Sequence, residues 1–266
     1  MGNKAIVFIC VDGPSDIDSL RQPFEDLFDT IGQDDIEVQF RHPKYQGKAK
    51  GDVTSMEGVT TETIEKTIYK YFFKDQDKQS TFGWQDVTTI IHIIDLDGAF
   101  EDADDIRLFT DEEEALANSL ITNGEPKNTL YLCDHIAVRK SLPARQDILS
   151  RKRKNIEYLR SLDEISVGKK TVRYCLYYFS CNLDHFLHGN ANMTGREKMQ
   201  CASKFSLRVM DADALVEYFT GNEFCTASSY EESWKCLRKC GASLQRCSNV
   251  HLLIDRIRNS TVDDWA

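Results

Sequence analysis

The sequence lacks a long apolar run, an excess of positive charge and any cluster of prolines. No apolar run in the 266 residues approaches the roughly 18–20 residues that span a bilayer, so we expect no membrane-spanning helix. Lys and Arg number 33 against 43 Asp and Glu, and the net charge of −10 excludes a protein that coats nucleic acid through bulk positive charge. A local basic patch beside a small metal-dependent site is compatible with this balance. The five prolines are scattered, and no linker marks a domain boundary.

The beginning of the sequence does not resemble an export signal. Its apolar stretch is only about seven residues long and runs into polar turn residues without a small-residue cleavage site. The nine cysteines are odd in number and scattered along the chain. We therefore expect reduced thiols and a location in the cytoplasm. Cys236, Cys240 and Cys247 fall on predicted amphipathic helices, where buried thiols are favoured over metal ligands.

The first 135 residues alternate strand-like and helix-like segments. Continuous apolar runs at 5–11 and 87–94 are typical of strands covered on both faces. Further strands are expected at 36–41 and 129–133, and helices after residue 14, at 61–73 and at 112–120. This alternation predicts an α/β fold with a parallel sheet flanked by helices.

The second half of the chain is more helical. A strand is expected at 171–179, and helices at 147–162, 197–205, 212–219, 231–239 and 250–258. We therefore predict a core at 1–135 and a mostly helical C-terminal part at 136–266 that completes the sheet. With 41% hydrophobic and 29% charged residues, the composition is that of an ordinary globular protein. A chain of this length needs no disulfide or metal to hold its core.

Acidic side chains follow two of the predicted buried strands. Asp12 opens the sequence Asp-Gly-Pro-Ser-Asp after the first strand, and Asp95 and Asp97 form an Asp-Leu-Asp-Gly motif after the strand at 87–94. The carboxyl ends of parallel strands are where ligands bind in open α/β sheets. Three carboxylates there would repel one another unless a cation lay between them, and oxygen ligands with several waters suit Mg²⁺. We expect Asp12, Asp95 and Asp97 to bind Mg²⁺, with Mn²⁺ as a substitute and Asp16 as a supporting ligand. Turn formation is the alternative for Asp12, and a helix-start role is the alternative for Asp16.

These two motifs together resemble the Toprim domain, the catalytic domain of topoisomerases, DnaG-type primases, OLD-family nucleases and small ribonucleases. The resemblance covers residues 4–135 and implies metal binding by Asp12, Asp95 and Asp97. Toprim proteins usually carry Glu where this chain has Asp12, and they commonly carry an acidic residue at the position of Asp16. Because Asp is one methylene shorter than Glu, metal binding transfers to Asp12 more directly than a general-base role does.

A second resemblance lies in the segment 179–188. Its Ser180, Asn182, Asp184 and His188 are similar to a Ser-Asn-acid-His segment that follows a late strand in RloB-like, phage-defence-associated Toprim proteins. The resemblance implies that Asn182 and Asp184 contact substrate and that His188 has a catalytic role. A structural histidine is the alternative for His188. Standalone Toprim proteins of this size resemble OLD-like and PARIS-type effector nucleases, which implies an ABC-type ATPase partner.

Basic residues cluster at 151–154 and 44–50. Lys152 and Lys154 lie on a predicted amphipathic helix, where they could guide a phosphate backbone or form an ordinary solvated helix face. Lys44, Lys48 and Lys50 follow the second strand, on a loop that the sheet geometry places near the same crevice.

Together these patterns predict a Mg²⁺-dependent endonuclease that acts in phage defence. A topoisomerase or a primase would need further domains, whereas phosphodiester hydrolysis needs only the metal site and positioning groups. The implied partners are a nucleic acid substrate, with tRNA among the candidates, and the ATPase subunit, and the chain could form a homodimer. The alternative, which Asp12 motivates, is a catalytically degenerate Toprim module that binds a protein partner or a nucleotide.

Overall fold

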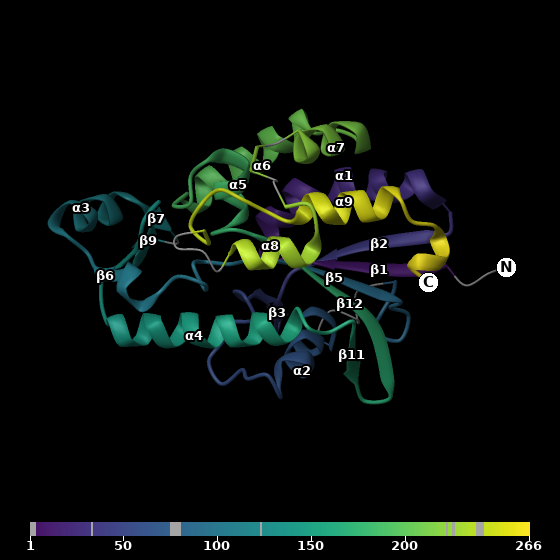
Figure 1. Cartoon of the computed structure of the whole chain (residues 1–266), viewed down its shortest axis with the longest axis horizontal. Coiled ribbons are helices and arrows are strands. Elements are labelled where there is room, and N and C mark those ends of the chain that lie inside the picture. Colours follow the sequence, from purple (N-terminus) through teal and green to yellow (C-terminus); the bar gives the residue numbers. More distant parts are fainter. Residues whose placement is uncertain are drawn as a thin grey trace.

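A five-stranded sheet forms the centre of the computed structural model (Figure 1). The structure describes residues 4–32, 34–74, 81–122, 124–221, 223–224, 227–237 and 242–266. The strands lie in the order β11-β12-β5-β1-β2, with β1 at Ala5–Cys10, β2 at Ile36–Arg41, β5 at Thr89–Asp95, β11 at Glu164–Val167 and β12 at Lys170–Phe179. Neighbouring strands run parallel except for β11, which is antiparallel to β12. The predicted α/β class with a largely parallel sheet is therefore confirmed.

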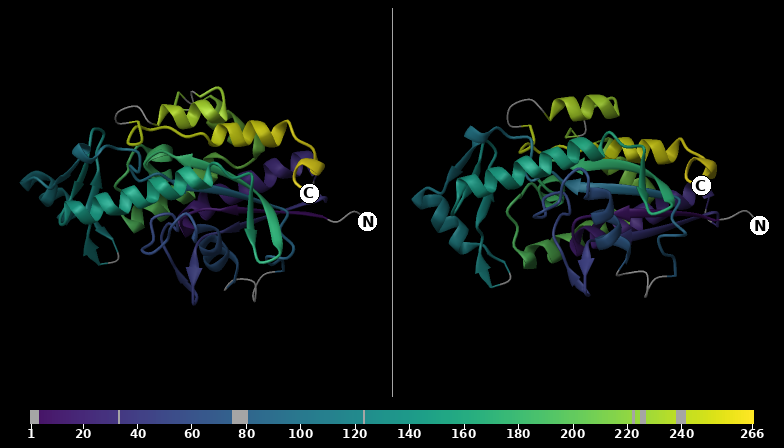
Figure 2. Two further views of the ribbon diagram at one scale, coloured as in Figure 1. Left: turned by 60° about the horizontal axis from the view of Figure 1, so that its bottom comes forward. Right: turned by 90° about the horizontal axis from the view of Figure 1, so that it is seen from below.

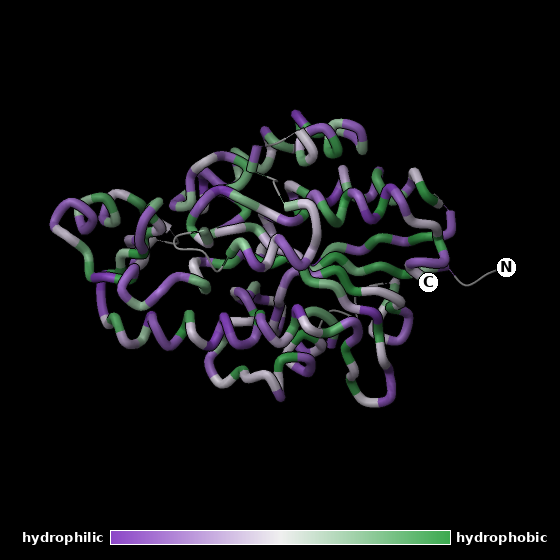
Figure 3. The backbone as a smooth tube through the Cα atoms, viewed as in Figure 1, coloured by the Kyte–Doolittle hydropathy of each residue, from purple (hydrophilic) through white to green (hydrophobic). Residues whose placement is uncertain are grey.

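Burial on both faces explains why β1 is a continuous apolar run. Val7 and Ile9 pack into the core on one face of the sheet, whereas Phe8 and Cys10 pack into the core on the other. Figure 3 shows the same distribution, with the apolar residues concentrated along the central strands. Because successive side chains of a strand point to opposite faces, a strand between two cores needs apolar residues at every position.

Helices cover both faces of the sheet, and Figure 1 shows α1 and α9 on one side and α2 and α4 on the other. The first face is covered by α1 (Pro14–Gly32), α5 (Leu183–His188), α6 (Gly195–Arg208), α7 (Ala212–Thr220) and α9 (Val250–Arg258). The second is covered by α2 (Ile64–Ile68), the π-helical turn η1 (Tyr69–Lys74), α4 (Leu142–Leu159) and α8 (Tyr230–Cys236). The predicted flanking helices are thus confirmed.

Three helix predictions differ from the structure in their bounds. The helix expected at 61–73 is α-helical only over Ile64–Ile68 and then becomes a π-helical turn. The basic helix expected from 147 begins at Leu142, because Ser141 accepts a hydrogen bond from the backbone N–H of Ala144 and a proline follows in the first turn. The helix expected at 231–239 is α8, and Lys239 lies outside the described residues.

The segment at 129–133 does not join the main sheet as expected. Strand β9 (Thr129–Tyr131) pairs antiparallel with β10 (Ile136–Val138), which pairs parallel with β6 (Ile106–Leu108), and these three strands form a separate sheet. Helix α3 (Asp111–Ser119) packs beside it through Ala117, which contacts Leu130. In β9 only the central residue is buried, too little apolar surface for the interior of the main sheet. Figure 2 shows this small lobe at the end of the molecule opposite the C-terminus.

Short elements complete the described structure. Strand β3 (Lys44–Tyr45) pairs with β4 (Lys48–Ala49), and β7 (Ile121–Thr122) pairs with β8 (Glu125–Pro126), each as a small antiparallel hairpin. Single 3-10 turns occur at Ala103–Asp105 and Val262–Asp264. In the described part of the chain, no helix combines the length and apolar character needed to cross a membrane.

The described cysteines are all free thiols. Cys10 and Cys181 are buried, whereas Cys236 and Cys247 are only partly buried. Their reduced state stays a prediction, and the expected burial of Cys236 and Cys247 is only partial. Cys240 lies outside the described residues.

Gly98 connects the main sheet to the small lobe and tolerates no side chain. Its φ of +75° lies in the left-handed region, and a Cβ there would lie 2.4 Å from Cδ1 of Ile136. Gly98→Ala is expected to lower the free energy of unfolding by about 2–4 kcal/mol, since backbone strain and overpacking add. Gly58→Ala is the matched control, because Gly58 has the same φ of +75° with no atom within 4 Å of the added Cβ. Urea denaturation of both variants separates backbone strain from overpacking. Equal losses of unfolding free energy would show that the side chain of Ile136 moves aside and that overpacking adds no cost.

Candidate functional site

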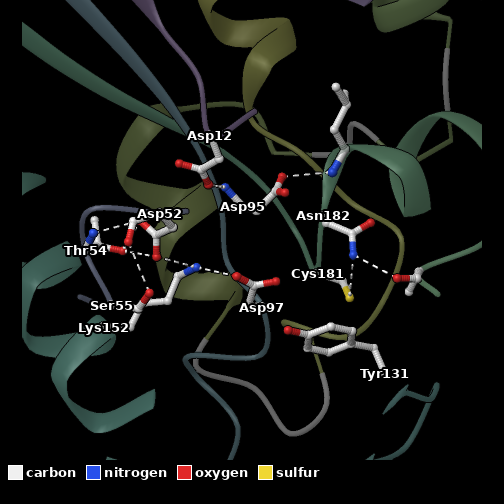
Figure 4. A network of polar contacts seen from close by, with 12 residues as sticks. Asp12, Asp52, Thr54, Ser55, Asp95, Asp97, Tyr131, Lys152, Cys181 and Asn182 are labelled. Atoms are coloured by element: carbon white, nitrogen blue, oxygen red, sulfur yellow. Dashed lines mark hydrogen bonds and ion pairs between the residues drawn. The ribbon is translucent and has the colours of Figure 1, made fainter. Parts of the chain in front are cut away.

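The carboxyl ends of β1, β5 and β12 meet around two aspartates. Asp12 follows β1, and its Oδ2 accepts a hydrogen bond of 2.9 Å from the backbone N–H of Asp95, the last residue of β5. Asp95 in turn accepts a 2.8 Å hydrogen bond through Oδ1 from the backbone N–H of Leu183, at the start of α5. Figure 4 shows the carboxylate of Asp12 at the backbone of Asp95 and the carboxylate of Asp95 directed away from Asp12. Asp12 and Asp95 therefore lie next to each other, as expected.

These two carboxylates lie in surroundings that disfavour their charge. Burial, reinforced by the carboxylates of Asp52 and Asp16, raises the pKa of Asp12 well above its ordinary value. Burial and the neighbouring Asp16 and Asp12 do the same to the pKa of Asp95. Oδ1 of Asp12 is buried, and no hydrogen-bond partner for it is found among the described residues. A cation placed between the two aspartates would relieve both the repulsion and the unmet hydrogen-bonding capacity.

Asp97 belongs to the same cluster but already has a cation. Its φ of +51° turns the chain sharply after β5, and its backbone N–H donates to the carbonyl of Cys181 at 2.7 Å. The Nζ of Lys152 lies 2.6 Å from its Oδ2. Burial opposes ionisation of Asp97, but Lys152 and Arg145 outweigh it and hold the pKa of this carboxyl below its ordinary value. Asp97 is therefore an ion-paired carboxylate, unlike Asp12 and Asp95.

Lys152 lies inside the acidic cluster rather than on the surface. It projects from α4, its residue is 0% exposed, and its Nζ also lies 2.9 Å from Oδ2 of Asp52 (Figure 4). The alternative of a solvated helix face is wrong for Lys152, because the residue is buried and its ammonium is directed at the carboxylates of Asp52 and Asp97. Its contact with a phosphate backbone stays a prediction, which these ion pairs do not favour. Lys154 is exposed and lines a different cavity with Thr60 and Arg151.

Asp52 was not singled out by sequence reasoning. Its Oδ1 accepts hydrogen bonds from the backbone N–H of Thr54 at 2.7 Å and from its hydroxyl at 2.6 Å, which fixes the loop that carries it. The Asp-x-Thr spacing is a turn signal, but nothing in it indicates a contact with a lysine 100 residues later. Lys48 and Lys50, just before Asp52, are exposed, and Lys44 is partly buried on β3.

A second ion pair lies on the other side of Asp95. Asp16, in the first turn of α1, accepts a 2.8 Å hydrogen bond from the backbone N–H of Gly13, as expected of a helix-start residue. Burial raises the pKa of Asp16 to about 6, with Asp184 adding to the rise and Lys198 opposing it. The Nζ of Lys198, on α6, lies 2.5 Å from Oδ2 of Asp184. Lys198 therefore neutralises Asp184 and is a second cation that the sequence did not reveal.

The segment after β12 contributes mainly to the framework of the site. Asn182 caps α5, since its Oδ1 accepts from the backbone N–H of His185 at 2.9 Å, and its Nδ2 donates to the carbonyl of Ala191 at 3.0 Å. Both ends of the amide are thereby used, which does not favour the expected contact of Asn182 with substrate. The hydroxyl of Ser180 donates to the carbonyl of Ala242 at 3.1 Å.

His188 ends α5 and packs edge-on against the ring of Phe205, with 6.4 Å between ring centroids. Burial lowers its pKa although Asp184 acts in the opposite direction. Within the described ranges it makes no hydrogen bond to a carboxylate. The structural alternative for His188 therefore accounts for its contacts, and its catalytic role stays a prediction.

Arg145, on α4, and Tyr131, on β9 of the small lobe, lie beside Asp97. Arg145, on α4, donates to the hydroxyl of Tyr131 at 2.9 Å and to the carbonyl of Asp97 at 3.3 Å. Burial raises the pKa of Tyr131, so its hydroxyl stays protonated at neutral pH. Arg145, which the sequence places near the basic run at 151–154, thus adds a third positive charge next to the aspartates, whereas Tyr131 was not predicted.

The donor set fits a single Mg²⁺ better than a cage of protein ligands. In the part of the chain that the structure describes, no group of three or more His, Cys, Asp and Glu side chains is arranged to hold a metal ion. Mg²⁺ commonly keeps several waters and binds through one or two carboxylates. Among the described residues Asp12 has a buried oxygen with no partner found, and both Asp12 and Asp95 have raised pKa values, so these two carboxylates would fit such a pair. Asp97 and Asp16, the other two predicted ligands, already bond to Lys152 and Gly13.

His92 lies behind the site and is expected to make stability depend on pH. It is 0% exposed, its Nδ1 shares a 2.8 Å hydrogen bond with the hydroxyl of Tyr174, and burial lowers its pKa to about 4. Below its unfolded pKa of about 6.5 the unfolded chain binds a proton that the folded chain refuses, so stability falls as pH drops. The loss contributed by His92 is expected to reach on the order of 3 kcal/mol by pH 4.

Urea denaturation of wild type and His92→Leu between pH 7 and pH 4 measures this contribution. Asp16 titrates in the same window with the opposite sign, because its folded pKa is raised and protonation stabilises the fold. The difference in free energy of unfolding between the two proteins removes the shared effect of Asp16. A difference that does not change with pH would show that His92 is protonated in the folded state.

Comparisons with known proteins give no relative for this chain: no protein-family model, no curated protein and no solved structure matches it.

Proposed function

We propose that this chain is a Mg²⁺-dependent nuclease that hydrolyses phosphodiester bonds at the edge of the sheet where Asp12 and Asp95 meet. One observation carries the proposal. Two partly buried aspartates follow neighbouring parallel strands at their carboxyl ends, both with raised pKa values, and one has a buried oxygen for which no partner is found among the described residues. A purely structural pair of this kind would be costly to keep, because each carboxylate disfavours the charge of the other.

The residues around the pair have distinct parts in this chemistry. Asp12 and Asp95 would hold the metal ion, which when bound polarises a phosphate and lowers the pKa of a water molecule. Lys152 keeps Asp97 ionised, and Lys198 forms an ion pair with Asp184. Arg145 donates hydrogen bonds to the carbonyl of Asp97 and to the hydroxyl of Tyr131, and it would place positive charge beside the phosphate.

The substrate class and the biological role in this proposal rest on the sequence resemblance. The acid after β1 and the Asp-x-Asp after β5 support a Toprim-type nuclease acting on RNA or DNA, with tRNA among the substrates to test. The same resemblance supports a role in phage defence beside an ABC-type ATPase subunit. These parts of the proposal are separate from the metal site, and each can fail without the other.

The test is cleavage of a panel of end-labelled single-stranded DNA, duplex DNA, RNA and tRNA by wild type and by Asp12→Asn. Mg²⁺, Mn²⁺ and EDTA are compared. Cleavage that requires metal and Asp12 supports the proposal. Cleavage that persists in Asp12→Asn, or none under any condition while no metal binds, contradicts it.

A second candidate is a module that binds metal or a partner without catalysis. It is favoured by the ion pair between Lys152 and Asp97, which removes one of the three predicted ligands, and by Asp12 standing where Toprim proteins usually carry Glu. Metal binding to Asp12 and Asp95 without cleavage of any substrate in the panel would select this candidate.

A further inference from the structure

A second cavity lies away from the carboxylates. It has a volume of about 600 Å³. One of its lining residues is Thr89, the first residue of β5, whereas Asp95 is the last residue of the same strand. Six residues of strand separate these two positions by about 20 Å. Its walls come from the end of α4, from β12, from α8 and from α9. A cavity of this size is typical of small-molecule sites.

Three arginines line this cavity without a carboxylate partner. Arg160 lies with its guanidinium carbon 5.7 Å from the ring centroid of Trp234, and Arg256 lies 4.9 Å from that of Trp265. Arg173 donates to the backbone carbonyl of Asp264 at 2.8 Å. Throughout the described ranges, no Asp or Glu side chain forms an ion pair with any of the three. Asp163 and Glu164 also line the cavity, and hydrogen bonds from Thr261, together with Arg256 and Arg173, lower the pKa of the nearby Asp264.

Aromatic rings stand beside these guanidinium groups. Tyr177 and Tyr230 meet edge-on with 5.8 Å between ring centroids, and the hydroxyl of Tyr230 donates to the carbonyl of Leu176 at 2.7 Å, which fixes its ring. Tyr174 also lines the cavity. Flat apolar surfaces and planar cations are thus held together in one concave site. A ligand that matches both has a planar ring and a negatively charged group.

We propose that this cavity binds a nucleoside phosphate. The guanidinium groups of Arg173 and Arg256 would take the phosphate, since arginine matches phosphate oxygens with paired N–H donors. The base would lie against Tyr230, which is partly exposed, with Arg160 beside it, because aromatic rings and guanidinium planes both stack on nucleobases. The site is independent of the proposed nuclease centre and needs no metal ion.

The test is calorimetric titration of the full chain in EDTA with AMP, ATP, adenosine, inorganic phosphate and a short oligothymidylate. The proposal expects AMP or ATP to bind more tightly than adenosine or phosphate alone. It expects Arg173→Gln with Arg256→Gln to weaken that binding at least about tenfold, the effect of losing one charge-assisted hydrogen bond or more. Because EDTA removes metal, failure here leaves the nuclease proposal untouched.

Arg258→Gln is the matched control, since Arg258 is exposed on the same helix and does not line the cavity. It is expected to bind nucleotide like wild type, and thermal unfolding checks that every variant is folded. The proposal is overturned if no nucleotide binds at millimolar concentration, or if the double variant binds like wild type. It is also overturned if phosphate alone binds as tightly as AMP, or if only the oligothymidylate binds.

Discussion

Asp95→Asn is expected to lower the rate of metal-dependent cleavage by at least about a hundredfold. Replacing even a partner that only orients a metal ligand typically costs 10- to 100-fold in metal affinity or activity, and Asp95 is proposed to contact the metal directly. The substitution keeps the shape of the side chain and removes its charge, so its Oδ1 can still accept from Leu183. The measurement is single-turnover cleavage of the best substrate in the panel, at saturating Mg²⁺.

The same variant should not lose stability, and this separates a metal ligand from a structural residue. Burial and the neighbouring Asp16 and Asp12 disfavour the charge of Asp95, so without metal the neutral amide is expected to leave the free energy of unfolding unchanged or to raise it. Asp29→Asn is the control, because Asp29 is exposed on α1. An Asp95→Asn protein that is both inactive and unfolded would instead assign Asp95 to the framework.

Lys152→Met is expected to destabilise the fold by about 3–5 kcal/mol, the usual cost of removing one partner of a buried ion pair. The Nζ of Lys152 lies within 2.9 Å of Asp52 and 2.6 Å of Asp97, and the residue is 0% exposed. Methionine fills a similar volume but leaves the carboxylates of Asp52 and Asp97 without their ion-pair partner. Urea denaturation measures the loss, and Lys154→Met, on the exposed face of the same helix, is expected to change stability by less than about 0.5 kcal/mol.

A double variant tests whether the loss comes from the stranded charge. Lys152→Met combined with Asp97→Asn removes one carboxylate along with the ammonium, so part of the stability should return. If the double variant is destabilised by the sum of the two single losses, the ion pair is energetically unimportant and packing of the lysine stem carries the effect.

The elements that sequence reasoning located correctly are those with a continuous local pattern. The apolar runs that become β1 and β5 predicted buried parallel strands, and the strand ends at Asp12 and Asp95 followed directly from them. Strand β9 was assigned to the wrong sheet, because three residues with one buried side chain carry no information about which strand they pair with.

The ion pairs of the site could not be predicted in the same way. Lys152 reads as part of a basic helix face, and only its packing against the loop that carries Asp52 shows that it is buried. Lys198 has no distinguishing neighbour in the sequence, yet α6 brings it to Asp184. Pairs that are distant along the chain depend on tertiary packing, whereas the role of Asn182 as a helix cap is a local feature.

The central claim is that Asp12 and Asp95 together form a metal site, and a calorimetric titration with Mn²⁺ tests it most directly. Wild type and Asp12→Asn with Asp95→Asn are compared at neutral pH, after both are shown to be folded by circular dichroism. The account predicts a binding isotherm for one metal ion in wild type and none in the double variant. An isotherm that is unchanged in the double variant, or one that is absent from wild type, would contradict it.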